Sequence, residues 1–284
     1  MKAIILLSLF ISSWSLFAQG KNSDPTQVTS QTPVQVQSIQ ERSFNKKLFF
    51  GVEAVNWDYK EIVANNKIFM KDSGNLYGIK IRYQNYFESI HFLLRTHMRY
   101  LYGATNYSGS YNDGTPVKLK TSNSIFETRV TGGFSFAPNA KFSITPYSGL
   151  SYRILTNPDS GTPGDYSRQI TYTMLPIGAH TNIALNNKQS LEFGVEYSYL
   201  IEGTVNTYIF GGVRNKQKKG FGWEANASFY HDFESFTFGV GPYYRIWDFE
   251  DSETVYRETS RGIYSFKEPK NLTKQMGINF SVLF

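Results

Sequence analysis

The last nine residues of the chain alternate between apolar positions and positions that are mostly small or polar. Apolar side chains stand at Met276, Ile278, Phe280, Val282 and Phe284, and small or polar residues fill three of the four positions between them. A period of two places successive side chains on opposite faces of an extended chain. The segment therefore predicts a β-strand with one apolar face and one polar face.

The same period recurs along most of the chain after residue 46. It predicts ten strands, with approximate ranges 47–58, 75–87, 90–103, 123–136, 141–155, 169–185, 190–201, 220–231, 235–248 and 272–284. Short connections near 87–89, 137–140, 186–189 and 232–234 alternate with long ones, so an even number of strands brings both ends to the short-turn side. Eight or twelve strands remain open, because the apolar stretch Tyr208–Val213 fits either a strand extension or an extra hairpin.

The parity of the alternation separates an apolar outer face from a polar inner face. The inner positions carry the members of an expected luminal charge network, which are Glu53, Lys80, Arg82, Arg95, His97, Arg99, Glu127, Arg129, Arg153, Glu192, Glu196, Glu224 and Arg245. Glu127 is expected to pair with Arg99, and Glu53 to lie near Arg82 and Arg95. The three acids Glu192, Glu196 and Glu224 lie close together in the predicted sheet. They are expected to find counter-charges in Arg153 and Arg245, reached across the lumen.

Composition favours a membrane-spanning barrel over a soluble β-sandwich. After the N-terminal segment no apolar run approaches the ~20 residues of a membrane helix. Mean hydropathy is −0.36, yet 17% of the residues are aromatic. This combination fits a transmembrane β-barrel, in which only alternate residues face lipid. The chain has no cysteine, so the fold must close without disulfides.

The N-terminal segment has the features of a cleaved secretory signal. Lys2 precedes an uncharged, largely apolar stretch that ends in Leu16-Phe17-Ala18, a plausible cleavage site. Residues 1–18 are therefore expected to be a signal peptide. Residues 19–46, rich in Gln, Ser and Thr, are expected to be a disordered periplasmic linker, and residues 47–284 the barrel.

The terminal strand that closes on Phe284 resembles the C-terminal insertion signal of Gram-negative outer-membrane β-barrel proteins. With the signal peptide, this resemblance implies a single antiparallel up-and-down barrel in the outer membrane. It implies insertion by the barrel-assembly machinery and a surrounding of membrane lipid and lipopolysaccharide. We expect a monomer. The net charge of +6 is modest and predicts no nucleic-acid partner.

Three functional interpretations follow. The first is a structural or surface-interaction barrel whose polar lumen is mostly filled, since side chains fill a barrel of eight to ten strands. The second is a narrow passive channel for small solutes, which inward glycines such as Gly51 and Gly194 keep open. The third is a surface enzyme similar to the omptin proteases or to lipid A-modifying barrels. The omptin family uses acids and a His–Asp pair at the extracellular rim, whereas His231-Asp232 falls at a predicted periplasmic turn, so no catalytic residue is assigned.

The remaining motifs predict little chemistry. Four scattered histidines and no cysteine predict no metal site, and no phosphate-binding loop or other cofactor motif is present. A basic run in the fourth long connection, with Arg214, Lys216, Lys218 and Lys219, is a candidate contact for lipopolysaccharide phosphates.

Overall fold

The computed structural model describes residues 48–110, 114–159, 166–209, 212–259 and 262–284. The expected signal peptide (1–18), the expected linker (19–46) and Lys47 lie outside these residues. Two short 3-10 helices, η1 (Ala64–Asn66) and η2 (Glu88–Ile90), interrupt a fold that is otherwise made of strands. In the part of the chain that the structure describes, no helix is long and apolar enough to cross a membrane.

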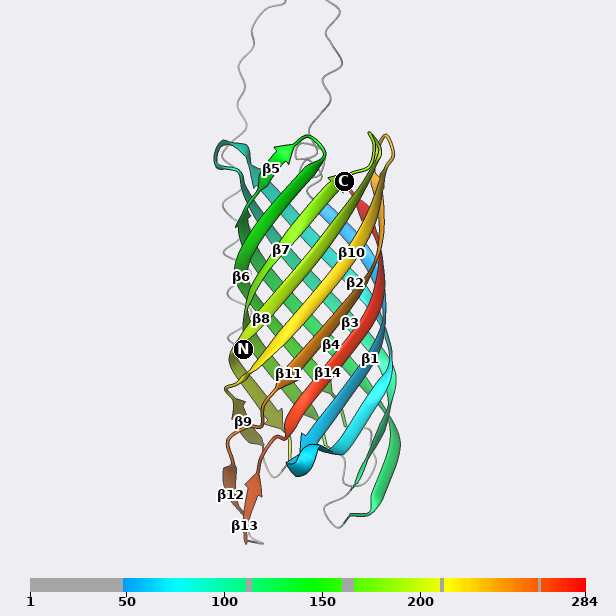
Figure 1. Ribbon diagram of the computed structural model, residues 1–284. Coiled ribbons are helices and arrows are strands. Elements are labelled where there is room, and N and C mark those ends of the chain that lie inside the picture. Colours follow the sequence, from blue (N-terminus) through cyan, green and yellow to red (C-terminus); the bar gives the residue numbers. More distant parts are fainter. Residues whose placement is uncertain (1–47, 111–113, 160–165, 210–211, 260–261) are drawn as a thin grey trace, which may run out of the picture. The chain divides into compact units, whose positions relative to one another are not determined.

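Ten antiparallel strands form the wall of a closed barrel (Figure 1). They are β1 (Leu48–Val63), β2 (Lys67–Phe87), β3 (Phe92–Ser110), β4 (Pro116–Phe134), β6 (Phe142–Asn157), β7 (Arg168–Ala184), β8 (Gln189–Thr207), β10 (Gly220–Asp232), β11 (Thr237–Phe249) and β14 (Lys270–Leu283). Each pairs with its neighbour in the chain, and β14 pairs with both β11 and β1, so the sheet has no free edge. The expectation of a ten-stranded antiparallel barrel is confirmed.

Four short strands lie outside this wall. β5 (Phe136–Asn139) pairs with β6, and β9 (Val213–Gln217) pairs with β8. β12 (Val255–Thr259) and β13 (Gly262–Phe266) form a separate hairpin. Sequence alternation misses these strands, because four or five residues are too few to show a period.

The first and last strands close the barrel along their whole length. Phe49 pairs with Leu283, Glu53 with Asn279 and Trp57 with Gln275. The N–H of Phe284 donates to the carbonyl of Leu48 at 3.0 Å. In this register the outward residues of β14 lie beside outward residues of β1, so the apolar outer face is continuous across the closure.

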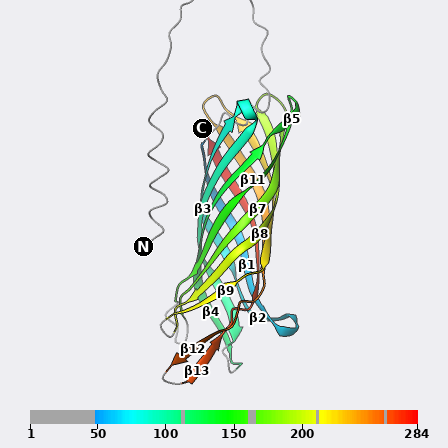
Figure 2. The ribbon, with the colours of Figure 1, turned by 90° about the vertical axis from the view of Figure 1, so that its left-hand side faces the viewer.

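The barrel has two unlike ends (Figures 1 and 2). The turn end carries Leu48, Phe284 and the short connections, with β5 beside them. The loop end carries the long connections and the β12–β13 hairpin. The start of β1 and the end of β14 therefore both lie at the turn end, as the even number of strands predicts.

Strands at the loop end extend further than the sequence predicts. The segments 59–74 and 104–122 were expected to be loops, but β1 runs to Val63, β2 begins at Lys67, and β3 reaches Ser110. The outward side chains at this end are largely polar, so the sequence no longer alternates between apolar and polar residues although the strands remain hydrogen-bonded to each other. Tyr208 and Ile209 belong to no strand, and β9 folds back on the end of β8 so that Val213 pairs with Thr207. The structure therefore has the extra hairpin at this place, and that hairpin adds no strand to the wall.

The outer wall is apolar through its middle. Val52, Ile79, Met98, Val130 and Val195 each expose between 39% and 59% of their surface. A continuous belt of this kind is unfavourable in water and matches the hydrocarbon core of a bilayer.

Aromatic rings border this apolar belt on both sides. Near the turn end the rings of Phe92 and Phe134 meet edge to face with centroids 5.3 Å apart, and Phe233 stacks on Phe236. Nearer the loop end Tyr197 packs against Trp223 at 5.0 Å. Paired aromatic girdles are typical of barrels that cross a membrane.

Candidate functional site

The lumen is filled in layers from the turn end to the loop end. At the turn end, buried inward side chains form a floor that includes Gln84, Ser143 and Asn182. Above it lies a charged chamber, then a layer of ion pairs, then an apolar plug, and finally a polar cluster at the loop-end mouth. The alternating pattern of each wall strand places its members in these layers.

Glu192 of β8 is held by two arginines from the opposite wall. Arg82 Nη1 lies 3.1 Å from Glu192 Oε1, and Arg95 Nη2 lies 3.0 Å from Glu192 Oε2. Arg95 Nε also donates to Gln84 at 3.1 Å. Arg82 and Arg95 were expected near Glu53, but they pair with Glu192 instead. Their side chains reach across the lumen to β8 at the height that the strand register gives them.

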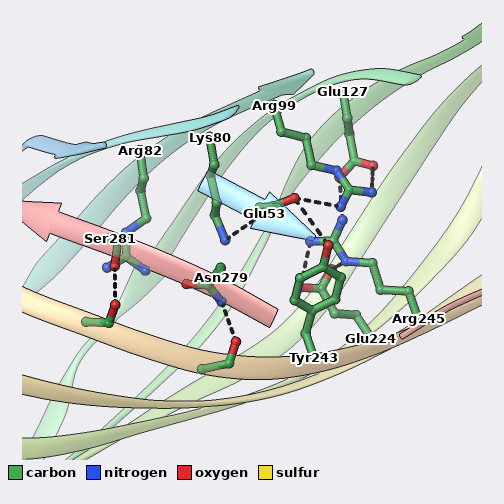
Figure 3. Close-up of polar contacts among 12 residues, drawn as sticks. Glu53, Lys80, Arg82, Arg99, Glu127, Glu224, Tyr243, Arg245, Asn279 and Ser281 are labelled. Atoms are coloured by element: carbon green, nitrogen blue, oxygen red, sulfur yellow. Dashed lines mark hydrogen bonds and ion pairs between the residues drawn. The ribbon is translucent and has the colours of Figure 1, made fainter. Parts of the chain in front are cut away.

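Glu53 of β1 instead accepts from a different set of donors (Figure 3). Arg99 Nη1 lies 3.5 Å from Glu53 Oε2, and the Tyr243 hydroxyl donates to the same oxygen at 3.2 Å. Lys80 Nζ stands 3.7 Å from Glu53 Oε1. Glu53 therefore joins three wall strands through one carboxylate.

Arg99 is among the most deeply buried members of the network. Its Nη2 lies 3.1 Å from Glu127 Oε2 and donates to Gln275 Oε1 at 3.0 Å. Side chains of Arg99 and Glu53 are fully buried, and that of Glu127 is nearly so. The structure thus brings together the expected pair Arg99 and Glu127.

Arg129 and Arg245 supply the charges that balance Glu196 and Glu224. Arg129 Nη1 lies 2.6 Å from Glu196 Oε2, and its Nη2 lies 3.3 Å from Glu224 Oε2. Arg245 Nε lies 2.9 Å from Glu224 Oε2, and its Nη1 is 3.5 Å from Glu127 Oε1. The ion pairs therefore run without a break from Glu53 through Arg99 and Glu127 to Arg129 and its two acids. Arg245 pairs with Glu224 as the sequence suggests (Figure 3).

Arg153 departs from its expected role as a counter-charge for the three clustered acids. Its guanidinium lies over the ring of Trp247 at 4.0 Å, and its Nε and Nη2 have no hydrogen-bond partner among the described residues. Glu127, its neighbour in the sheet register, is instead occupied by Arg99 and Arg129. The alternation of the sequence predicts that Arg153 faces the lumen, but it does not predict the level along the barrel axis at which its side chain lies.

The chamber between the floor and the ion-pair layer has a volume of about 70 Å³. Its lining includes Lys80, Arg95, Arg129, His97 and His180. His180 stacks on Tyr147 with centroids 4.4 Å apart, and His97 Nε2 has no hydrogen-bond partner among the described residues.

All four histidines lie away from the loop end. His91 caps η2 at the turn end, His231 pairs in register with Phe238 near the same end, and the other two line the chamber. The arrangement that the omptin comparison requires, a histidine with acids at the outer rim, is not formed by any of them.

The apolar plug fills the loop-end half of the lumen, a feature that the sequence reading of a polar interior missed. Its members are Val55, Trp57, Tyr59, Met70, Leu76, Leu101, Ile125, Leu155, Ile170, Tyr172, Met174, Leu200, Val205, Tyr243, Trp247 and Phe249. Tyr172 stacks on Phe249 with centroids 3.9 Å apart, and Leu76, Leu101 and Ile125 are fully buried. The sequence did contain a sign of the plug. Within their strands Leu76, Leu101 and Ile125 are an even number of positions from the luminal charged residues, so they face the same way.

A cluster at the mouth joins the last long connection to the wall. Arg168 Nη1 lies 3.2 Å from Glu268 Oε1 and also pairs with Glu61. The Tyr59 hydroxyl lies within hydrogen-bond distance of two acceptors for its single proton, Glu61 at 3.1 Å and Glu268 at 3.3 Å. The pKa of Glu268 is raised to about 7, because burial and the nearby charge of Glu61 together outweigh the lowering effect of Arg168. Sequence analysis missed this mouth cluster because its residues fall at predicted strand ends and loops.

The same connection is tied down by backbone contacts. Ser252 N–H donates to the Glu268 carbonyl at 2.9 Å, and Glu268 N–H donates to Ser252 Oγ at 2.8 Å. Asn215 of β9 donates to the carbonyls of Glu253 and Phe266. The two flanks of this connection, at Ser252–Glu253 and at Phe266–Glu268, are thus bonded to each other and to Asn215 of β9.

The basic run lies on the opposite, outward face of β9 and just beyond it. Arg214, Lys216, Lys218 and Lys219 are exposed, whereas Val213, Asn215 and Gln217 between them are buried. Lys216 Nζ lies 3.7 Å from Glu202, and Lys218 pairs with Glu253. Alternation in β9 therefore displays the cations on the outer wall at the loop end.

The residues of the expected insertion signal also share one face. Met276, Ile278, Phe280 and Phe284 expose between 37% and 65% of their surface on the outer wall, and Val282 is half-buried beside them.

Comparison with known proteins identifies a fold. No protein-family model matches the chain, and no curated protein matches its sequence. The structure is similar to that of the outer-membrane protease OmpT from Escherichia coli, with 11% identity and a TM-score of 0.58 over 84% of this chain and 94% of OmpT. At this identity the likeness establishes the barrel fold and no activity.

Two further solved structures are more distant. The toluene transporter TodX of Pseudomonas putida matches at 8% identity and a TM-score of 0.37, over 84% of this chain and 89% of TodX. Ail of Yersinia pestis, in its complex with sucrose octasulfate, matches at 11% identity and a TM-score of 0.32, over 83% of this chain and 98% of Ail. These TM-scores are too low to carry an argument.

Proposed function

We propose that the protein is an integral outer-membrane β-barrel with a filled lumen and a structural or surface-interaction role. The apolar outer belt and its aromatic borders support a place in a membrane. The secretory signal expected in residues 1–18 supports export. The turn end is then periplasmic and the loop end extracellular, as in barrels with short periplasmic turns.

The apolar plug is the observation that carries this proposal. Its sixteen side chains pack together across the loop-end half of the lumen and are at most 5% exposed. A solute path needs accessible space as well as polar groups. Trp57 and Phe249 are close-packed, and the polar residues that pair with them in register, Gln275 and Asn271, are fully buried too, which argues against a path at that level. The narrow passive channel is the runner-up interpretation, because the chamber below provides polar space.

Planar-bilayer recording tests the filled-lumen proposal. Purified full-length protein is expected to produce no stepwise conductance, because the plug and the ion-pair layer both block the lumen. An open porin reconstituted in parallel serves as the positive control for insertion. Steady openings from this protein would refute the filled lumen and favour the channel.

The exposed cations of β9 support a second proposal, that the outer wall contacts lipopolysaccharide. In this orientation Arg214, Lys216 and Lys218 face outward at the extracellular end. Lipopolysaccharide phosphates are concentrated at that level of an outer membrane, and basic side chains bind such groups by charge-assisted hydrogen bonds. Among the described residues, Arg214 and Lys219 have no ion-pair partner, so their charges remain available.

Removing those two charges is expected to weaken lipopolysaccharide binding. The double variant Arg214→Gln/Lys219→Gln should lose about 1 kcal/mol for each cation, an effect that salt screens. Binding is measured by titrating lipopolysaccharide into protein in detergent at low and high salt. The matched control is Lys118→Gln/Lys120→Gln, which removes two exposed lysines of β4. Equal affinities of the two variants would contradict the proposed site.

The alternating end of β14 supports a third proposal, that Phe284 is part of a signal read by the barrel-assembly machinery. Phe284 is 59% exposed and continues the outward row of Met276, Ile278 and Phe280. Deleting Phe284 is expected to lower the amount of heat-modifiable barrel in the outer membrane several-fold. Phe284→Tyr, which keeps an aromatic ring at this position, should assemble normally. Undiminished assembly of the deletion variant would exclude a signalling role.

A further inference from the structure

We propose that the outer face of β10 and its neighbouring strands holds the lipid A part of lipopolysaccharide, an acylated and phosphorylated disaccharide. β10 lies between β8 and β11 in the wall, and the basic run of β9 directly precedes it in the chain (Figure 1). The inference rests on the proposed contact between this run and lipopolysaccharide. It names the part of the lipid that is held and the side chains that hold it.

Aromatic side chains of β8 and β10 form the middle of the site. Phe221 pairs in register with Tyr199, and the next outward pair is Trp223 with Tyr197. The Tyr197 ring lies with its centroid 5.9 Å from that of Phe221 and 5.0 Å from that of Trp223. Trp223 and Tyr199 are still 52% and 53% exposed. The negative face of an aromatic ring attracts the C–H groups of a sugar ring, so this cluster is a surface on which a sugar can stack.

Short apolar side chains follow on the turn-end side of the aromatic cluster. The outward residues of β10 there are Ala225 and Ala227. Ala225 lies between Val195 of β8 and Tyr244 of β11, and Ala227 pairs with Phe193 of β8. The side chains on the neighbouring strands are longer than these two methyl groups. An acyl chain that lies along β10 can therefore contact the wall from below and from its sides.

Positive charge lies on the loop-end side of the aromatic cluster. Lys219 is exposed and stands immediately before β10, two positions from Phe221. Lys216 is on the outer face of β9, where it pairs in register with Thr204 of β8, and half of its side chain is exposed. Ammonium groups at this level can bind a phosphate by charge-assisted hydrogen bonds.

The occupant follows from the order of these groups along the wall. From the loop end to the turn end the site presents cations, then aromatic rings, then short apolar side chains. Lipid A presents phosphate, sugar and acyl chain in the same order when it lies in the outer leaflet. A glycerophospholipid brings a phosphate and acyl chains but no sugar ring to cover Tyr199 and Trp223. Lipid A is therefore the lipid that matches all three layers.

Tryptophan fluorescence tests the site directly. Among the described residues Trp223 is the one tryptophan on the outer wall, since Trp57 and Trp247 are buried in the plug. Protein is reconstituted in vesicles of phosphatidylcholine with brominated acyl chains, which quench Trp223 on contact. Adding unbrominated lipid A is expected to restore the emission and to saturate at a low lipid A fraction. Unbrominated phosphatidylcholine only dilutes the quencher and should restore it in proportion. Equal recovery with the two lipids would overturn the site.

Two variants test the two ends of the site. Lys219→Gln should weaken lipid A binding about fivefold, which corresponds to about 1 kcal/mol for one cation. Ala225→Phe fills the space beside the aromatic cluster and should weaken binding by at least as much. Ala54→Phe makes the same change at an outward position of β1 and should bind as the wild type. Wild-type affinity in a heat-modifiable Ala225→Phe barrel would overturn the proposal.

The results also separate this inference from the proposed contact on which it rests. Binding of lipopolysaccharide in detergent that depends on Arg214 and Lys219, without recovery of Trp223 emission by lipid A, would keep the basic contact and refute the β10 site. Loss of both results would refute the contact itself. Recovery of Trp223 emission that Lys219→Gln weakens is the result expected here.

Discussion

Arg99→Met is expected to destabilise the barrel by about 3–5 kcal/mol, the usual cost of removing one partner from a buried ion pair. Arg99 is fully buried and serves three acceptors, at 3.5 Å from Glu53, 3.1 Å from Glu127 and 3.0 Å from Gln275. Methionine fills most of the volume but leaves Glu53 with only the distant Lys80 as counter-charge. The buried carboxylates, rather than the lost arginine itself, account for most of the penalty.

The measurement is the free energy of unfolding in urea, followed by tryptophan fluorescence in detergent or lipid. The control is Lys71→Met, which removes one partner of an outward pair, 3.6 Å from Asp58 and 46% exposed. Such a pair contributes at most about 1 kcal/mol. A loss in Arg99→Met no larger than in the control would show that water or ions compensate the carboxylates.

The sequence predicts the wall of this barrel well. Strict alternation identifies each strand and the face it turns outward, because a period of two has only one structural interpretation over ten or more residues. The parity that puts Phe280 and Val52 outside also puts Arg99 and Glu127 inside. The strand count and the meeting of β1 with β14 follow from the same pattern and are confirmed.

Partners across the lumen are less predictable. Strand tilt and register set the height of each inward side chain, and neither is written in the alternation of one strand. Arg82 was expected near Glu53 but lies beside Glu192, and Arg153 was expected among acids but lies over Trp247. The register between non-adjacent strands emerges only when the barrel closes.

The apolar plug and the mouth cluster show two further limits. Leu76, Leu101 and Ile125 have luminal parity, yet an inward apolar residue looks the same in sequence as an outward one shifted by a single position. The mouth residues Glu61, Arg168 and Glu268 are far apart in the chain and meet only because β1, β7 and the last connection converge. No local pattern connects them.

Closure of the mouth is expected to weaken as the pH rises through about 7. Glu268 faces Tyr59 and Glu61 from β1 and Arg168 from β7, and its own segment adds Ser252. Burial raises the pKa of Glu268 from 4.5 to about 7. The folded state thus binds a proton that the unfolded segment releases, and stability that is fully present below pH 4.5 is lost as the pH approaches 7. When both Glu61 and Glu268 are ionised, a single guanidinium must balance two carboxylates.

Hydrogen exchange of residues 250–269 measures this closure. After correction for the intrinsic rate, protection in the wild type should fall between pH 5 and pH 8, by up to about 3 kcal/mol from the size of the pKa shift. In Glu268→Gln the neutral amide mimics the protonated acid, so protection should stay high and vary little with pH. Glu258→Gln makes the same change on the exposed hairpin and should behave as the wild type. Wild-type protection that is constant over this range, or a Glu268→Gln variant that retains the full pH dependence, would show that Glu268 does not control the mouth.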